Sequence, residues 1–340
     1  MKTIKILGRE EIALTEAPAP ALKAGEALLR VEYAGFCGSD LNTYLGKNSM
    51  AKMPVVPGHE IGARVLQAGE GAPAHIVEGC ACTVNPYTAC GICPSCLKGR
   101  PNACRDNRTL GVQRDGAMSE LIAVPWEKVI ADRGISPLHF ALVEPLSVGF
   151  HAVARAAVTD VDSVAVIGCG MIGMGAILRA ALRGACVIAL DLDDDKLAVA
   201  REFGASFTVK VSEGGVEQRL AEITSGAMPD VCIEASGSPA ACLTALACTG
   251  FCGRMICIGY APSEVPLPTK VVVQKELDLR GSRNALPEDF RAVMACLRSN
   301  RFPVGKLISA VYPPEQAADA MAKWAGAPSK VFRMMLKFGE

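Results

Sequence analysis

The chain has 340 residues, half of them apolar, and its 35 basic side chains match its 35 acidic ones. A chain of this length exceeds what one hydrophobic core usually serves, so we expect two domains. The balanced charge and the lack of an arginine-rich run argue against nucleic acid as a partner. The N-terminal segment MKTIKILGREEIAL lacks the apolar core of a signal peptide, and the apolar run over residues 164–178 is too short to cross a bilayer. We therefore expect neither export nor membrane insertion.

Fifteen cysteines are spread along the chain. Disulfide scaffolds are typical of small exported proteins, so a long chain without an export signal favours reduced thiols in a cytoplasmic setting. Five of the fifteen are candidate metal ligands. The other ten, among them Cys186, Cys232 and Cys257, are expected to be small buried apolar side chains.

The N-terminal part of the chain predicts a small β domain. Short apolar runs over residues 4–7 and 27–33, separated by Pro and Gly, are typical of strands. Proline and glycine over residues 54–58 indicate a loop or a helix start, and not a regular strand, around His59 and Glu60. Strand character resumes over residues 63–66.

Cys37 and the adjacent pair His59 and Glu60 outline a candidate metal site. A thiolate, an imidazole and a carboxylate together suit Zn²⁺, and three protein ligands leave a fourth position for water or substrate. An open zinc ion can acidify an alcohol. The same residue types are also compatible with a buried structural cysteine beside a core histidine and a surface glutamate.

A second cysteine cluster follows in the segment ACGICPSCLKGRPNAC, with intervals of two, two and seven residues between its members, Cys90, Cys93, Cys96 and Cys104. Four thiolates can close a tetrahedral zinc shell without an open position, so this site is expected to be structural. Four cysteines also suit an iron–sulfur cluster, which is the alternative.

A glycine-rich segment predicts dinucleotide binding. An apolar strand over residues 164–167 runs into GCGMIG, which opens a helix-like stretch and contributes the candidate cofactor residues Gly168, Gly170, Ile172 and Gly173. A second strand over residues 186–190 ends at Asp191. The glycines permit a tight turn and close approach of a pyrophosphate, and Asp191 can hydrogen-bond the ribose hydroxyls of NAD. Helix capping or solvation is the alternative role for Asp191.

The strands and helices expected further along the chain alternate. Strand-like runs over residues 231–234 and 254–258 are separated by a helix over residues 240–247, which is typical of a doubly wound α/β sheet. The segment GSRNALPEDF follows, and a helix is expected over residues 287–297.

These motifs together resemble the zinc-dependent medium-chain alcohol and polyol dehydrogenases, over nearly the whole chain. The resemblance implies that Cys37 and His59 bind zinc, and that Glu60 binds it or supports it. It also implies that Ser39 relays the substrate hydroxyl proton and that Asp40 orients His59. Two positions depart from the family pattern, because Ala63 replaces a usual Gly and Asn42 replaces a frequent relay His. An Asn cannot titrate near neutrality, so proton exit would need water or another group.

Glu144, in the segment LVEPLSVGFHAV, resembles the polyol branch, in which a glutamate replaces a cysteine ligand of simple alcohol dehydrogenases. The resemblance implies that its carboxylate completes the catalytic zinc shell directly or through the zinc-bound water, and an ordinary helix-start carboxylate is the alternative. The family fold implies an α/β protein with a GroES-like catalytic domain, residues 1–147 and 286–340. A Rossmann domain, residues 148–285, is inserted between these parts. Substrate would bind in the cleft between the domains, and a homodimer or homotetramer is expected.

The segment GSRNALPEDF resembles the hexonate 5-dehydrogenases, which act on sugar acids such as L-galactonate or L-gulonate. We therefore expect Arg283 to bind the substrate carboxylate, with Asn284 beside it, although a structural or cofactor ion pair is an alternative for Arg283. NAD is expected over NADP, because Asp191 would repel a 2′-phosphate. Polyol and L-threonine-type dehydrogenases, and a non-catalytic nucleotide sensor, are the alternative functions.

Overall fold

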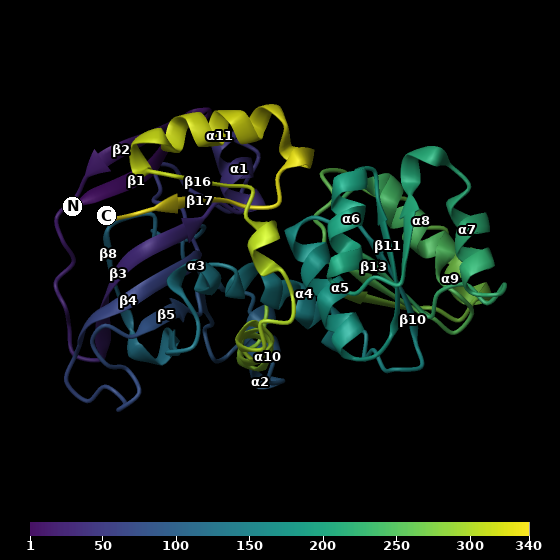
Figure 1. Ribbon diagram of the computed structural model, residues 1–340, viewed down its shortest axis with the longest axis horizontal. Coiled ribbons are helices and arrows are strands. Elements are labelled where there is room, and N and C mark those ends of the chain that lie inside the picture. Colours follow the sequence, from purple (N-terminus) through teal and green to yellow (C-terminus); the bar gives the residue numbers. More distant parts are fainter. Residues whose placement is uncertain (340) are drawn as a thin grey trace. The chain divides into compact units, whose positions relative to one another are not determined.

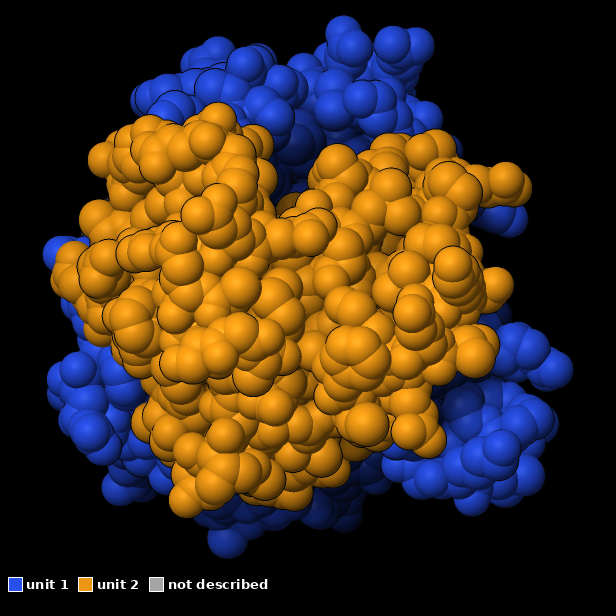
Figure 2. Space-filling model, turned by 90° about the vertical axis from the view of Figure 1, so that its right-hand side faces the viewer, with its two compact units in different colours: residues 1–144, 294–340 blue, residues 145–293 orange. Residues whose placement is uncertain are grey.

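The structure is a computed structural model that describes residues 1–339. The chain folds into two compact units, coloured separately in Figure 2: residues 1–144 together with 294 onwards, and residues 145–293. Both boundaries fall inside helices, α4 (Val143–Arg155) and α10 (Pro287–Arg298). The boundaries expected from the sequence, at 147/148 and 285/286, lie nearby.

The first unit is built on a seven-stranded sheet (Figure 1). Its order is β16 (Ala310–Tyr312), β17 (Met334–Lys337), β3 (Glu26–Gly35), β4 (Glu60–Ala68), β5 (Ala81–Val84) and β9 (Val129–Ala131), and β8 (Leu121–Pro125) also pairs with β3. Along β3, Ala27, Leu29 and Val31 are buried at every second position, as expected for a strand with one face on the core. The strands expected over residues 27–33 and 63–66 are therefore confirmed.

Smaller elements complete this unit. The hairpin of β1 (Lys2–Gly8) and β2 (Glu11–Glu16) lies beside helix α11 (Ala317–Gly326), in agreement with the strand expected over residues 4–7 (Figure 1). Helix α1 (Gly38–Tyr44) follows β3 directly. Residues 90–104, which carry the four clustered cysteines and are called the lobe below, contain the short helix α2 (Pro94–Leu97). The two-stranded pair β6 (Tyr87–Thr88) and β7 (Arg108–Thr109) flanks this lobe in the chain.

The second unit contains six parallel strands in the order β12 (Phe207–Lys210), β11 (Cys186–Asp191), β10 (Ser163–Ile167), β13 (Val231–Glu234), β14 (Arg254–Cys257) and β15 (Asp278–Gly281). Numbered within the unit this is 3-2-1-4-5-6, the Rossmann order, which confirms the doubly wound sheet. Helices α5 (Met171–Leu182) and α6 (Asp194–Glu202) cover one face, and the other face carries α7 (Val216–Ile223), α8 (Pro239–Cys248) and α9 (Thr269–Gln274) (Figure 1).

A close helix crossing positions the start of this sheet. A Cβ on Gly149 of α4 would lie 2.4 Å from the Ala176 nitrogen of α5, and one on Gly175 of α5 would lie 2.7 Å from the Leu146 oxygen of α4. Only glycine permits this separation of the two backbones. The crossing sets the position of α5, which begins at the glycine-rich turn.

Two sequence expectations are wrong. Glu60 is the first residue of β4 and not part of a loop or helix start, because its backbone pairs with Gly35 of β3, whereas His59 lies in a loop as expected. Cys186 is exposed at the start of β11 and Cys252 is exposed as well, so the cysteines outside the metal clusters are not all buried. Cys232 is buried as expected, and Cys257 is half-buried.

No helix within residues 1–339 combines the length and the apolar character that crossing a bilayer requires.

Candidate active site and metal centres

Cys37, His59 and Glu60 come together in the first unit. One ligand atom from each, a sulfur, a ring nitrogen and a carboxylate oxygen, lies within 4.8 Å of the other two. Cys37 is the N-cap of α1, His59 immediately precedes β4, and Glu60 is the first residue of that strand. Two segments, one leaving β3 and one entering β4, thus assemble the trio expected from the sequence.

Glycine makes room for this arrangement. Gly35 of β3 pairs with Glu60 of β4, and a Cβ on Gly35 would lie 2.2 Å from Glu60 Oε2. The carboxylate therefore occupies the space of the missing side chain. Gly58, which precedes His59, has φ of +101°, where its Cβ would lie 2.8 Å from Met118 Cγ, so it too must be glycine.

Several polar atoms at the trio are buried without hydrogen bonds in the described part of the chain: Ser39 Oγ, His59 Nδ1 and both carboxylate oxygens of Glu60, of which Oε2 is ion-paired with Arg333. Buried polar atoms normally have partners, because leaving them unsatisfied costs free energy. A cation and a substrate hydroxyl would satisfy such atoms. The donor set of sulfur, nitrogen and oxygen with an open position fits a catalytic zinc ion.

Asp40 contributes differently from what the resemblance implies. Its Oδ2 accepts a hydrogen bond from the Cys37 backbone nitrogen at 2.8 Å, as part of the cap of α1. Within residues 1–339, no hydrogen bond joins Asp40 to His59. Asp40 therefore fixes the backbone that carries the Cys37 thiol, and burial raises the pKa of its own carboxyl group.

The buried groups at the trio are electrostatically coupled. Burial lowers the pKa of His59, but the Cys37 thiolate, Glu144 and Asp40 outweigh it and raise that pKa well above the usual value. Burial raises the pKa of Glu60 to about 7, against the opposing charge of Arg333. Metal binding requires both groups deprotonated, so a cation and these protons compete for the same site.

Arg333 is a site residue that sequence reasoning missed. Its Nε lies 2.9 Å from Glu60 Oε2, its Nη1 donates to the Phe36 carbonyl at 2.7 Å, and its side chain is only 4% exposed. The signal in the sequence is weak: a charged residue directly before the three apolar residues that begin β17. Such a residue indicates a buried partner, because unpaired charges are rarely buried.

Glu144 lies outside the trio, in the first turn of α4, and is buried. The Tyr87 hydroxyl, also buried, donates a hydrogen bond to its Oε1. The charge of Glu144 contributes to the raised pKa of His59, so the two groups lie within electrostatic reach. Tyr87 is the second site residue that sequence reasoning missed, because nothing in its local sequence indicates a distant carboxylate partner.

The four cysteines of the lobe also converge, with their sulfurs all within 4.8 Å of one another: Cys90, Cys93, Cys96 and Cys104. Cys93 Sγ lies 3.5 Å from Cys96 Sγ and 3.8 Å from Cys104 Sγ. A zinc tetrahedron with bonds near 2.3 Å places its sulfurs about 3.8 Å apart. Sulfurs spaced evenly around one point fit a single ion, whereas a cluster of several irons would spread them farther.

One thiol of the lobe is already biased toward the thiolate. Hydrogen bonds, first from Ser95 and then from backbone groups, lower the pKa of Cys93 to about 5, whereas burial and the hydrogen bond to Cys93 raise the pKa of Cys96 to about 11. Backbone nitrogens also point at the other sulfurs, with Cys90 N 3.3 Å from Cys104 Sγ and Cys93 N 3.4 Å from Cys90 Sγ. Such donors favour the charged ligand form.

The glycine-rich turn of the second unit has the shape that a dinucleotide requires. Gly168 has φ of +95°, and a Cβ on Gly173 would lie 1.8 Å from the Gly168 oxygen, so both positions demand glycine. A Cβ on Gly170, the N-cap of α5, would meet nothing within 4 Å. Gly170 therefore borders open space at a helix N-terminus, where a phosphate binds well. Ile172 lies half-buried in the first turn of α5.

Asp191 ends β11 beside this turn. Its Oδ2 accepts a hydrogen bond from the Cys169 nitrogen at 2.6 Å, and its Oδ1 accepts one from Leu192 at 2.8 Å. The cap of α6 is Asp193, whose side chain accepts from Asp195 and Lys196. Helix capping, the alternative role for Asp191, therefore belongs to its neighbour.

Three further residues considered from the sequence lie on other segments of the chain. Arg283 and Asn284 belong to the second unit, follow β15 and are half-buried. Asn284 has φ of +53°, a left-handed conformation that asparagine tolerates better than most residues. Asn42 is exposed on α1.

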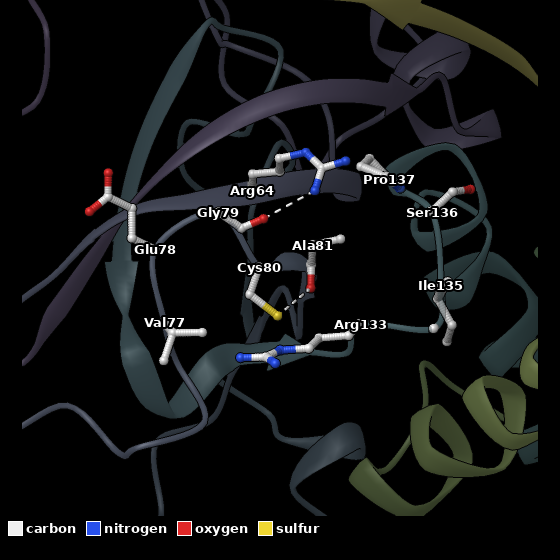
Figure 3. Close-up of a pocket in the computed structure, with 11 residues that line it drawn as sticks. Arg64, Val77, Glu78, Gly79, Cys80, Ala81, Arg133, Ile135, Ser136 and Pro137 are labelled. Carbon is white, nitrogen blue, oxygen red and sulfur yellow. Dashed lines mark hydrogen bonds between the residues drawn. The ribbon is translucent and has the colours of Figure 1, made fainter.

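A surface pocket of about 550 Å³ in the first unit is separate from these sites (Figure 3). Its lining includes Arg64, which donates to the Gly79 carbonyl at 3.0 Å, and Cys80, whose thiol faces the Ala81 carbonyl at 3.6 Å. Within residues 1–339, no residue of either metal cluster lines it. The pocket is thus not part of the candidate active site.

Comparison with known proteins identifies the family. Residues 23–133 match the model of the alcohol dehydrogenase GroES-like domain, and residues 172–299 match that of the zinc-binding dehydrogenases. The chain is 32% identical to an erythritol/L-threitol dehydrogenase of Mycolicibacterium smegmatis, over 92% of this chain and 91% of that one. It is 30% identical to the L-galactonate-5-dehydrogenase of Escherichia coli, over 89% of each chain.

A solved structure supports the same assignment. The short chain alcohol dehydrogenase (rspB) of Escherichia coli CFT073, complexed with NADH, superposes with a TM-score of 0.91 at 28% identity, covering 99% of both chains. Zinc and a nicotinamide dinucleotide are the cofactors of such enzymes. The chain belongs to the zinc-type medium-chain alcohol and polyol dehydrogenase family, and it is a dehydrogenase with a GroES-like domain and a Rossmann domain.

Proposed function

We propose that this dehydrogenase oxidises a secondary hydroxyl of a sugar acid, a hexonate such as L-galactonate or L-gulonate, with NAD⁺. The main support is that Cys37, His59 and Glu60 converge and include buried polar atoms without hydrogen bonds in the described part of the chain. The second unit of the same chain contains an open glycine-rich turn. Relatives named for L-galactonate and for erythritol/L-threitol support a polyhydroxylated substrate.

The residues of the first unit would have separate roles in metal binding and proton transfer. Cys37, His59 and Glu60 would hold the zinc ion, which acts as a Lewis acid when bound and acidifies the substrate hydroxyl. Ser39, whose buried Oγ has no hydrogen-bond partner in the described part of the chain, would relay the hydroxyl proton: its Oγ takes up the substrate proton as its own hydroxyl proton passes on to water. Glu144 adds a buried negative charge next to the trio and supports the cation. Because Asn42 is exposed and cannot titrate, the proton would leave through water.

The substrate carboxylate would be bound by Arg283, with Asn284 beside it. A guanidinium grips a carboxylate through two parallel hydrogen bonds. Arg283→Met retains the apolar stem and removes the charge, so kcat/KM for a hexonate should fall by the equivalent of about 1.5–3 kcal/mol. The corresponding polyol should lose little. An equal loss for both substrates, or a raised KM for NAD⁺ alone, would assign Arg283 to structure or cofactor binding.

A polyol is the second candidate substrate, favoured by the erythritol/L-threitol relative at 32% identity. A panel of hexonates, matching polyols and L-threonine, assayed with NAD⁺ and the zinc-loaded enzyme, distinguishes these candidates. We expect the highest kcat/KM with a hexonate. Turnover of polyols at equal or higher kcat/KM would replace the sugar acid with a polyol, and turnover of L-threonine alone would replace both.

We also propose a homodimer or homotetramer. Among the strands within residues 1–339, β15 pairs with β14 alone and forms one edge of the second unit's sheet, and Leu279 on it is 41% exposed. Open edges with apolar side chains are usually covered. Light scattering during size-exclusion chromatography measures the assembled mass, and a monomer at micromolar concentration would contradict the proposal.

We propose that the protein works in a reducing, cytoplasmic setting, because its cysteines in the described part of the chain are not joined in disulfides. Within residues 1–339 no disulfide joins any of the fifteen cysteines, and both metal clusters require thiolates.

A further inference from the structure

The hydroxyl of Tyr87 makes a buried hydrogen bond that has no part in the roles proposed above. It donates a hydrogen bond to Glu144 Oε1 inside the first unit, where Tyr87 is 6% exposed and Glu144 is 4% exposed. A hydrogen bond to an ionised acceptor is stronger than a neutral one, and burial strengthens it further. This contact therefore constrains where the carboxylate can lie.

The backbone around Tyr87 is held on three sides. Its nitrogen donates to Asn85 Oδ1 at 3.1 Å, its carbonyl accepts from Lys128 Nζ at 2.8 Å, and the residue pairs with Thr109 across β6 and β7. The ring thus starts from a fixed point. A side chain with two torsions and a fixed backbone aims its hydroxyl at a defined position.

The Glu144 carboxylate is a possible further ligand for a metal ion at the trio. It carries a negative charge in the first turn of α4, close enough to His59 to affect its pKa, yet its oxygens are not among the atoms that converge in the trio of Cys37, His59 and Glu60. A buried carboxylate whose charge reaches His59 can become a fourth protein ligand unless its contacts, the Tyr87 hydroxyl among them, hold it away. A fourth protein ligand closes a zinc shell, as in structural sites, whereas catalytic zinc keeps one position for water or substrate.

We propose that Tyr87 is a positioning residue that holds the Glu144 carboxylate outside the trio, and so keeps one coordination position open for substrate. This inference rests on the proposed zinc site at Cys37, His59 and Glu60. The pKa of Tyr87 is raised well above its usual value, by burial first and then by the charge of Glu144, so the hydroxyl remains a donor throughout the working pH range.

The test replaces the catalytic zinc with Co²⁺ while the lobe keeps its zinc, and compares Tyr87→Phe with the parent enzyme. The variant removes the donor and keeps the ring. Releasing Glu144 onto the metal should change the visible d–d spectrum and slow metal release to a chelator by about tenfold, the lower end of the effects seen for groups that support metal ligands. KM should rise more than kcat falls, because the carboxylate now competes with substrate.

Three further variants complete the design. Tyr33→Phe removes the hydroxyl of a half-buried tyrosine in β3 and should match the parent enzyme. Tyr87→Phe combined with Glu144→Ala should return the release rate toward the parent value, because the competing ligand is gone. Glu144→Ala alone should keep the parent d–d spectrum, and this readout remains available even if Tyr87→Phe fails to fold.

The direction of the release rate decides the inference. Faster or unchanged metal release in Tyr87→Phe would mean that Tyr87 only supports packing, and a changed spectrum in Glu144→Ala would mean that Glu144 is already a ligand. Either outcome overturns the role of Tyr87. Failure of the parent enzyme to bind Co²⁺ outside the lobe would instead overturn the zinc site itself.

Discussion

Three constraints meet at Glu60. The missing side chain of Gly35 provides its space, the buried Arg333 provides an opposing charge 2.9 Å away, and the β4 backbone fixes its main-chain position. Burial without these supports would keep the carboxyl group protonated and unable to bind a cation. The position of this single carboxylate therefore depends on residues far apart in the sequence.

Gly35→Ala is expected to disturb the catalytic metal selectively. Its Cβ would lie 2.2 Å from Glu60 Oε2, so either the carboxylate or strand β3 must move, at a cost of about 1–3 kcal/mol typical of overpacking. Metal analysis should show the lobe zinc retained and the second zinc reduced. The matched control is Gly38→Ala, whose Cβ would meet nothing within 4 Å. Equal metal contents in the two variants would refute the account of Gly35.

Asp191 sets the expected cofactor preference. Its carboxylate would face a 2′-phosphate as a like charge, so the enzyme should prefer NAD⁺ to NADP⁺, and Asp191→Ala should narrow the ratio of the two kcat/KM values. Steady-state kinetics with both cofactors measures this ratio. Comparable values for the two cofactors in the unchanged enzyme would show that another group reads the ribose.

At the scale of elements, helix α5 and its N-cap contain two glycines with different roles. Gly173 packs its backbone against the Gly168 carbonyl, so that helix and strand approach closely, whereas Gly170 faces open space at the helix N-terminus. Both glycines lie in one short motif, yet only one is required by the fold itself. The other is required by whatever approaches the turn.

Two substitutions separate these duties. Gly173→Ala should lower thermal stability strongly, because its Cβ would lie 1.8 Å from a backbone oxygen. Gly170→Ala should leave the melting temperature nearly unchanged and weaken NADH binding, because the added methyl group occupies space that the pyrophosphate needs. Differential scanning fluorimetry and NADH fluorescence titration give the two readouts. A Gly170→Ala variant with unaltered NADH affinity would place the pyrophosphate elsewhere.

The same elements show what sequence patterns can and cannot reveal. The strands around Gly168 and the interval to Asp191 were predictable, because local periodicity and glycine spacing carry that information. The trio was predictable from residue types and a family resemblance. Arg333 and Tyr87 were not, because each acts through a partner that is distant in the chain, Glu60 and Glu144 respectively. The strand position of Glu60 was missed because its pairing with Gly35 outweighs the local proline and glycine signals.

At the scale of the whole molecule, the candidate metal sites and the candidate dinucleotide site lie in different units. Both metal clusters lie in the first unit, and the glycine-rich turn lies in the second. The first unit therefore depends on metal for its local structure in a way that the second does not.

We expect two zinc ions per chain when the protein is purified without added metal. Cys37→Ser should retain one zinc and lose turnover, with a melting temperature close to that of the parent. Cys96→Ser should lose the lobe zinc and melt at a lower temperature, because the loop from Cys90 to Cys104 has little other support. Plasma emission analysis and calorimetry test both variants. Iron with sulfide in the lobe, or a single zinc in the parent, would contradict the assignment.

The passage of the chain between its two units has a practical consequence. Because both boundaries fall inside helices, α4 and α10, the chain has no extended linker at either of them. A protease needs an unwound segment to fit its cleft, and a helix offers one only after local melting. Gentle digestion should therefore nick exposed loops before it severs the units, and an engineer wishing to graft a new cofactor module must match helical phase at two splice points.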